Sequence, residues 1–375
     1  MRIAILTLPL HGNYGGILQN YALQHVLKRM GHTVETVQLP WEWKIPLWRQ
    51  PLSYSKRFIK KYFLHRPCRI FEEKWFNASE KVLIKKLQAF VTLYINVRKV
   101  KKFTDLQEND YDALIVGSDQ VWRPKYTYRP IENVYLSFAS HWKNIKRISY
   151  AASFGTDEWE YMPEQASHCK ELVKLFDGIS VREASGVALC KEHLGVEALH
   201  VLDPTLLLDA EDYQRLFEHD DRLHQPEGQL LTYVLDETQD KQAIIQTLAN
   251  RFQYTPYRAN SKYEDHSAPL AERIQPPVEQ WLKDFHEAKF IVTDSFHATV
   301  FSILFGKPFV VIGNKARGLS RIHSLLGLFG LENHIVYKVE DVDLASDYSF
   351  DKQQISSSLQ AWRKKSLDFL LKNLQ

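Results

Sequence analysis

The chain has 375 residues, of which 45% are hydrophobic and 25% charged, as in a globular protein long enough for two domains. Its net charge of +3 is too small to indicate nucleic acid as an obligate partner. The three cysteines, Cys68, Cys169 and Cys190, are odd in number and far apart, so they support neither a disulfide framework nor a thiolate zinc site and fit a reducing cytoplasm best.

The first 40 residues have the pattern of one β-loop-α-β unit. Residues 2–8, RIAILTL, predict a buried parallel strand, and the turn-rich loop 9–16 leads into a helix from Gly16 to Met30. This first apolar run is too short for a signal peptide, and no apolar stretch approaches the ~20 residues of a membrane helix. We therefore expect a cytoplasmic protein that is at most peripheral on the inner face of the cytoplasmic membrane.

Residues 41–103 differ in composition and predict an excursion out of the sheet that is partly helical. Within them, residues 41–69 interleave Trp, Tyr and Phe with Lys and Arg, a mixture that suits an anionic membrane interface. The alternative is a lid or helical insertion packed on the first domain.

The alternation of strands and helices then continues through two halves. In the first half, strand-then-loop units are predicted at 111–122, 147–155, 177–183 and 198–208, with a helix near 162–176. In the second half, strands are predicted at 229–235, 253–258, 289–293 and 308–312, and helices at 238–252, 278–288, 297–305 and 318–329.

This pattern predicts an α/β protein with two doubly wound parallel sheets that face each other. We expect domains at 1–208 and 209–350, followed by an amphipathic helix at 351–375. Ligands bind such sheets at the carboxyl ends of the strands, so the loops after the strands are the candidate site.

One imidazole and several cations occupy these loops. Ser295 is a predicted N-cap, which places His297 in the first turn of a helix, where unpaired N–H groups attract anions. The loop after the next strand carries the cations Lys315, Arg317 and Arg321, and Arg182 follows a strand of the first half. We expect these groups to line one crevice around a small, multiply charged anion, with His297 as proton donor. His297 as a structural group and Lys315 and Arg317 as surface charges are the alternatives.

The loops of the first half carry neutral donors, acceptors and aromatic rings, which suit sugar hydroxyls. Their glycines fit neither GxGxxG nor a Walker loop. The candidate acceptor-binding residues are Asn13, Tyr14, Gly15, Gly16, Gln19, Ser118, Gln120, Trp122 and Ser153. Asp119 could accept a hydroxyl proton or cap the next helix, and Gly15-Gly16 could be only a tight turn. No metal-ligand spacing such as HExxH is present, and we expect no metal and no cofactor.

Together these stretches resemble the polysaccharide pyruvyl transferase family. The matching segments are NYGGILQNYALQ (13–24), YDALIVGSDQVW (111–122), YAASFG (150–155), ISVRE (179–183), VLDPTLLL (201–208), VTDSFHATVFS (292–302) and GKPFVVI with RGLSRIHSLL (306–326). The resemblance implies a GT-B-like fold of two Rossmann-like domains around a central cleft. It also implies transfer of a pyruvyl group from phosphoenolpyruvate, the donor substrate, to a sugar as a ketal.

The resemblance also implies roles for individual residues. His297 would be the general acid and Arg182 a ligand of the donor's anionic groups, with Lys315 or Arg317 as the basic residue after the next strand. Ser295 stands where other branches of the family carry an arginine, so donor binding would depend more on Arg317, Arg321 and the helix N-terminus.

The first domain, with its insertion 41–103, would be the acceptor side and the second the donor side. The implied acceptor is a sugar. We expect it to belong to a glycan linked to polyprenyl diphosphate, a precursor of bacterial capsule, exopolysaccharide or cell wall. Two alternatives stay open: a GT-B glycosyltransferase that uses a sugar nucleotide, and a non-catalytic protein that binds glycans or anions.

Overall fold

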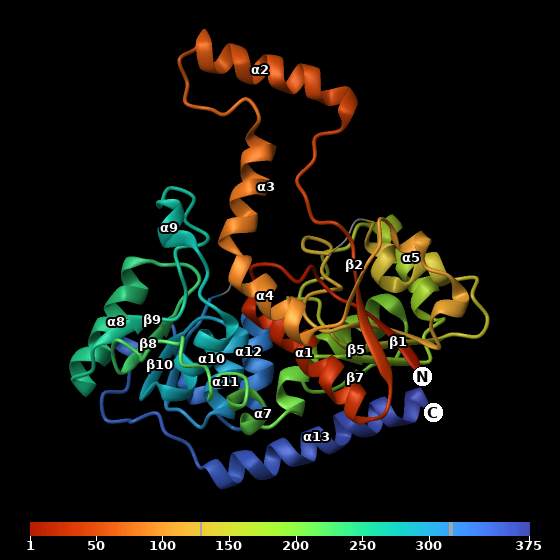
Figure 1. Ribbon diagram of the computed structural model, residues 1–375. Helices are drawn as coiled ribbons and strands as arrows, with labels where there is room; N and C mark the ends of the chain where they lie inside the picture. The colour runs from red at the N-terminus through yellow and green to blue at the C-terminus, as the bar shows by residue number, and fades with distance from the viewer. Residues whose placement is uncertain (128–129, 315–317) are drawn as a thin grey trace.

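The computed structural model describes residues 1–127, 130–314 and 318–375 and contains two parallel β-sheets (Figure 1). The first sheet has seven strands in the order β3-β2-β1-β4-β5-β6-β7, all paired in parallel. Its strands are β1 (Arg2–Leu6), β2 (Thr33–Gln38), β3 (Val97–Lys99), β4 (Ala113–Gly117), β5 (Lys146–Ala152), β6 (Gly178–Val181) and β7 (Leu199–His200).

The second sheet has five strands in the order β12-β11-β10-β8-β9, also all parallel. Its strands are β8 (Leu230–Tyr233), β9 (Pro256–Arg258), β10 (Phe290–Thr293), β11 (Phe309–Ile312) and β12 (Ile335–Val336). The predicted class, two parallel-sheet α/β units, is therefore confirmed. Of the strands predicted in the second half, all four are present, and β12 is an additional short one.

Helices cover both sheets, except for α2 and α3, which lie in an arm outside them. They are α1 (Tyr14–Arg29), α2 (Gln50–Tyr62), α3 (Glu72–Leu83), α4 (Lys85–Tyr94), α5 (Pro163–Val173), α6 (Ala184–Leu189), α7 (Ala210–Gln214), α8 (Gln239–Phe252), α9 (Leu270–Arg273), α10 (Val278–Glu287), α11 (Phe296–Leu304), α12 (Leu319–Gly327) and α13 (Lys352–Leu374). None of the helices in the described part of the chain is long and apolar enough to cross a membrane.

The inner strands β4, β8, β10 and β11 are buried on both faces, which explains why their apolar residues are continuous rather than alternating. In β4 every residue is buried. Ile115 belongs to the core on the α1 side of the sheet, and Leu114 and Val116 to the core on the opposite side, which contains Trp122 and Tyr135.

One hydrophobic core joins the two sheets. Ile5 and Ile115 of the first sheet and Ile291 and Val311 of the second belong to the same buried cluster, together with side chains of α1, α10 and α11. The two sheets are thus packed through a shared interior, and the loops at their carboxyl ends are held close to each other.

Between β2 and β3 the chain leaves the sheet as an extended arm. Figure 1 shows α3 as a stalk that carries α2 away from the body of the molecule. α4 packs on α1 at the base of the arm, whereas α2 has no buried residue. The helical insertion weighed as the alternative for 41–69 is therefore present, but its helix α2 does not pack on the first domain.

Candidate active site

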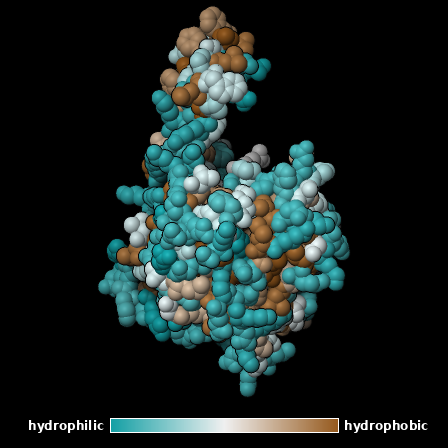
Figure 2. Space-filling view, turned by 90° about the vertical axis from the view of Figure 1, so that its right-hand side faces the viewer, coloured by the Kyte–Doolittle hydropathy of each residue, from teal (hydrophilic) through white to brown (hydrophobic). Residues whose placement is uncertain are grey.

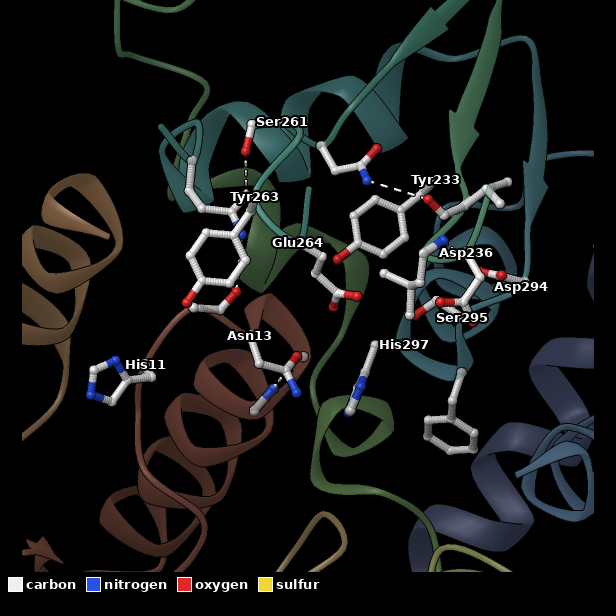
Figure 3. A pocket seen from close by; sticks show the side chains of 18 of the residues that line it. His11, Asn13, Tyr233, Asp236, Ser261, Tyr263, Glu264, Asp294, Ser295 and His297 are labelled. Carbon is white, nitrogen blue, oxygen red and sulfur yellow. Dashed lines mark hydrogen bonds between the residues drawn. The ribbon is translucent and has the colours of Figure 1, made fainter. Parts of the chain in front are cut away.

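A cavity of about 910 Å³ opens between the two sheets. Its walls are the loops that follow β1 and β4 on one side and those that follow β8, β9 and β10 on the other. Figure 3 shows His297 facing this space from the second sheet and Asn13 facing it from the first. The cavity therefore lies at the carboxyl ends of parallel strands, where α/β folds bind ligands.

His297 lies in the first turn of α11, directly after β10, and its side chain is 9% exposed. Its ring packs against the first turn of α1: a Cβ atom added at Gly15 would lie 1.9 Å from His297 Nδ1. Any residue with a Cβ atom would collide with the imidazole here. Only glycine lets the ring approach the backbone this closely. Ser295 occupies the N-cap position as predicted, but its side chain makes no capping hydrogen bond.

Asp203 lies on the other side of the imidazole, with Oδ2 3.7 Å from His297 Nε2. It follows β7 and begins a short 3-10 helix, where its other oxygen accepts hydrogen bonds from the backbone and side chain of Thr205. Burial raises the pKa of Asp203, but the neighbouring His297 and Arg182 outweigh burial and hold this pKa well below its ordinary value. A fixed negative charge therefore stands beside the ring.

Arg182 does not face the cavity, in contrast to the expectation. Its side chain is 1% exposed and surrounded by acids: Nη1 lies 2.8 Å from Asp203, Nη2 3.6 Å from Asp119 and Nε 3.9 Å from Glu183. The loops after β4 and β6 and the segment after β7 each bring a carboxylate to this one guanidinium. Arg182 consequently acts behind the cavity wall and not as a wall residue.

Arg321, on α12, does line the cavity and is nearly enclosed by protein. Burial and the charge of Arg182 lower its pKa to about 10, although Asp119 and Glu183 oppose this shift. Both guanidiniums lie near the Phe296 ring, with the Arg182 and Arg321 Cζ atoms 4.4 and 5.9 Å from the ring centroid. The candidates Lys315 and Arg317 lie outside the described residues.

Three further candidates line the cavity from the first sheet: Asn13, Asp119 and Gln120. Asn13 is the N-cap of α1, and its Oδ1 accepts a hydrogen bond of 3.2 Å from the Gly16 backbone. Asp119 has a left-handed backbone with φ of +62°, which turns its carboxylate between the cavity and Arg182. Gly16 lies in the same wall.

Two aromatic candidates for acceptor binding are instead buried in packing. Tyr14 stacks on Trp281 with a centroid distance of 5.5 Å, and its hydroxyl donates to the Pro276 carbonyl at 2.9 Å. Trp122 stacks on Tyr135 and donates its indole N–H to a carbonyl of the same core. Neither ring is therefore available to a sugar. The sequence does not reveal this, because a loop pattern does not show which side chains turn inward.

Three polar candidates, Gln19, Ser118 and Ser153, are also buried away from the cavity. The Gln19 side chain links α1 to the loop after β4: its Nε2 donates to the Gly16 carbonyl, and its Oε1 accepts from the Ser118 backbone N–H. The Ser118 hydroxyl donates to Asp203 at 3.1 Å, and the Ser153 hydroxyl donates to Glu183 at 2.9 Å. The two serines therefore position acids around Arg182, and none of the three residues lines the cavity.

The end of the cavity remote from His297 contains residues that the sequence analysis did not identify. Tyr263 donates its hydroxyl to Glu80 on α3, and His11 Nδ1 lies 3.9 Å from the same carboxylate. Burial lowers the pKa of His11 to about 4, and its ring lies 4.0 Å from that of Trp41. Figure 3 shows His11 and Tyr263 on one side of Asn13 and His297 on the other. The aromatic composition of 41–69 is the one signal that points here, through Trp41.

Asp294 was also missed, although it lies in the same segment as His297. Its carboxylate accepts from Lys241 Nζ at 2.6 Å and from the Leu235 backbone at 2.8 Å, so it ties the loop after β8 to the start of α11. Among residues 1–127, 130–314 and 318–375, no group of three or more His, Cys, Asp or Glu side chains is placed to hold a metal ion.

Comparison with known proteins identifies one family. The family whose sequence model carries the description "Polysaccharide pyruvyl transferase" matches residues 13–316. No curated protein matches the chain.

Several solved structures resemble the chain at low identity. The glycotransferase of kitacinnamycin shares 13% identity with a TM-score of 0.47, over 100% of this chain and 99% of that one. UDP-GlcNAc 2-epimerase from Neisseria meningitidis shares 12% with a TM-score of 0.48, over 99% and 100%. A glycosyltransferase from Rickettsia africae shares 10% with a TM-score of 0.49, over 100% and 97%.

Proposed function

The chain belongs to the polysaccharide pyruvyl transferase family, and we propose that it transfers the pyruvyl group of phosphoenolpyruvate to a sugar, with His297 as the general acid. Membership in the family implies a transferase. The observation that supports His297 is its position: it faces the cavity between the two sheets, in contact with Gly15 and 3.7 Å from the Asp203 carboxylate. At 3.7 Å the carboxylate lies beyond hydrogen-bond distance, but its charge is close enough to attract the positively charged imidazole that donates a proton.

The proposed reaction balances as two additions to one carbon. His297 gives a proton to the methylene carbon of phosphoenolpyruvate, which becomes a methyl group, and C2 becomes an electrophile. One sugar hydroxyl adds to C2 and the C–O bond to phosphate breaks, after which a second hydroxyl adds and closes the ketal. Of the two hydroxyl protons released, one restores His297 and the other leaves with phosphate.

Asp119 is the proposed acceptor of a hydroxyl proton. It lines the cavity, and its carboxylate lies 3.6 Å from Arg182. A carboxylate at this wall is within reach of a hydroxyl bound in the cavity, which is the position that a general base requires.

The donor end of the cavity is proposed to lie at α11 and α12. The first turn of α11 presents unpaired N–H groups, and Arg321 and His297 face the same space. Both features suit a carboxylate and a phosphate on one small molecule. Ser295 stands in the same wall, and Lys315 and Arg317 remain proposed donor ligands from the neighbouring loop.

The acceptor end is proposed to lie at Asn13, Gln120 and the group formed by His11, Trp41 and Tyr263. Amide groups and aromatic rings together suit the hydroxyls and the apolar faces of a sugar. We propose that this sugar belongs to a glycan carried on a polyprenyl diphosphate, a precursor of capsule, exopolysaccharide or cell wall. Such a carrier would bring the enzyme to a membrane surface.

Phosphate release from phosphoenolpyruvate in the presence of candidate glycans tests the proposal. H297A should lower turnover by ~10²–10⁴-fold, the usual contribution of general acid catalysis, while the variant still binds the donor. H219A, which removes a fully exposed imidazole, should leave turnover unchanged. Near-normal turnover of H297A would reject the assignment, and consumption of UDP- or GDP-sugars with phosphoenolpyruvate untouched would replace the proposed reaction by glycosyl transfer.

A further inference from the structure

Helix α2 and its flanks expose large apolar side chains at the end of the arm. Figure 2 shows hydrophobic atoms gathered over this projecting tip. Trp48 is 75% exposed and Phe63 70% exposed, and Leu52 and Ile59 between them are also exposed. Water-exposed apolar groups in a contiguous patch mark an interaction site rather than a solvent-facing helix.

The two faces of α2 differ sharply. Tyr54 and Arg57 point toward α3, where both side chains bond the Glu73 carboxylate at 2.6 and 2.7 Å. The opposite side, which we call the α2 face, consists of Leu52, Lys56, Ile59, Lys60 and Phe63, spaced as one stripe of a helix. The contacts with Glu73 fix the helix on its stalk so that this face is turned outward.

The charge of the tip has one sign. Residues 43–71 contain four lysines and four arginines and no aspartate or glutamate. Of these cations, Arg57 is neutralised by Glu73. Lys56 and Lys60 are exposed on the α2 face itself, beside its apolar side chains. Apolar and aromatic groups flanked by lysines are the composition of helices that lie in an anionic lipid interface.

We propose that the α2 face docks on an anionic membrane surface, with its apolar side chains at headgroup depth and its lysines against lipid phosphates. A second copy of the chain is the other candidate for an apolar face of this kind. Symmetric pairing would bring the same cationic, acid-free surfaces together, and like charges across an interface are unfavourable. An anionic surface satisfies both the apolar stripe and the charge.

Helix α3 connects the α2 face to the cavity. Along α3, Glu73, which holds α2, and Glu80, which lines the cavity, are seven residues apart, a rise of about 10 Å. Trp41, also in the cavity wall, contacts Phe76 midway along α3. A membrane-bound acceptor would therefore need a polar segment of roughly that length between its lipid and the accepting sugar. This last point rests on the proposed function, whereas membrane docking does not.

Co-sedimentation with vesicles tests the docking. The full chain should bind vesicles of phosphatidylcholine and phosphatidylglycerol in equal parts at low salt, release at high salt, and ignore phosphatidylcholine alone. K56E/K60E should weaken binding by at least ~20-fold, since each lysine near an anionic surface contributes about 5-fold. L52S/I59S/F63S should abolish binding. Because α2 has no buried residue, both variants should keep the thermal unfolding midpoint of the parent.

The matched controls make the same types of substitution at exposed residues outside the arm. K364E/K372E reverses two exposed lysines of α13, and L344S/L371S removes two exposed leucines, and neither should weaken vesicle binding. Absence of binding to the anionic vesicles at low salt would overturn the proposal, as would equal losses in the controls. A dimer that L52S/I59S/F63S converts to a monomer, without vesicle binding, would assign the face to a second copy instead. Vesicle binding is measured without donor or acceptor, so failure of phosphoenolpyruvate turnover would leave this result unaffected.

Discussion

Gly15 and His297 come from different halves of the chain and meet across the cavity. Because an added Cβ at Gly15 would lie 1.9 Å from Nδ1, G15A must displace the imidazole. Small displacements of a catalytic group cost ~10²-fold in rate, so we expect G15A to lower turnover by about that factor with little loss of stability. Steady-state phosphate release measures the effect.

The adjacent glycine provides the control for this prediction. At Gly16 the nearest atom to an added Cβ is Asp119 Oδ2 at 3.5 Å, an ordinary contact, so G16A should retain most of the activity. Equal losses in G15A and G16A would show that the helix start, and not the ring of His297, responds to the substitution.

Arg182 should prove to be a stabilising residue at neutral pH. Its guanidinium is the shared partner of the buried carboxylates Asp119, Glu183 and Asp203. R182Q leaves these acids without their cation, and breaking a buried ion pair costs about 3–5 kcal/mol. Denaturant unfolding should show this loss.

The exposed pair of Arg258 and Glu237 serves as the comparison, and R258Q should cost no more than about 1 kcal/mol. If R182Q folded with nearly full stability but bound phosphoenolpyruvate poorly, Arg182 would instead be a donor ligand, and its side chain would have to turn into the cavity.

At the residue scale, the sequence predicts which loops meet but not which way their side chains face. His297, Asp119 and Arg321 reach the cavity because the carboxyl ends of parallel strands share an edge. Tyr14 and Trp122 occupy similar loop positions but turn into the interior, where Trp281 and Tyr135 stack on them. These partners are distant in sequence, so no local pattern indicates the inward direction.

At the element scale, α10 carries a carboxylate whose burial opposes folding. Burial raises the pKa of Asp284 to about 6, although the Gln280 side chain, which donates to it at 2.9 Å, acts against the shift. A raised pKa means that the folded state binds the proton more tightly than the unfolded state. The resulting penalty is absent below pH ~4, grows between pH ~4 and about 6, and is complete above that range.

D284N should therefore stabilise the protein above pH 6, by at most about 3 kcal/mol, and by almost nothing at pH 4. Free energies of unfolding from denaturant titrations at a series of pH values measure this difference. A gain that stays constant across the range would mean that the amide improves packing or hydrogen bonding, and that the charge of Asp284 is irrelevant.

Strands and helices were predictable where their apolar residues pack into a hydrophobic core. Predicted strand 289–293 corresponds to β10 and predicted helix 278–288 to α10, because each apolar pattern has a buried partner. The predicted helix start at Gly16 was late, since Asn13 caps α1 from Tyr14. The shape of the arm was not predictable: α2 has an amphipathic pattern but no buried residue, and its sequence does not show that it stands apart from the body of the molecule.

At the scale of the whole molecule, α13 straps the two sheets together. Its first residue, Lys352, lies close to Gly306 of the second half, and its last turns reach the first sheet, where Phe369 contacts Tyr150 and Asn373 lies close to Gly178. With the shared hydrophobic core, this helix couples the stability of both halves. The cavity walls should consequently be held in one arrangement by a single folded unit.

Leucines 370 and 371 of α13 test this coupling. Leu370 is fully buried in the shared core, and truncating such a side chain costs about 2–5 kcal/mol, so L370A should lower global stability by that amount. Leu371 is 45% exposed, and L371A should change stability by no more than about 0.5 kcal/mol. If the halves unfold as one unit, amide hydrogen exchange in L370A should accelerate together in β4 of the first sheet and in β11 of the second. Acceleration in β4 alone would mean that the first sheet opens independently and that the shared core does not make the two halves cooperative.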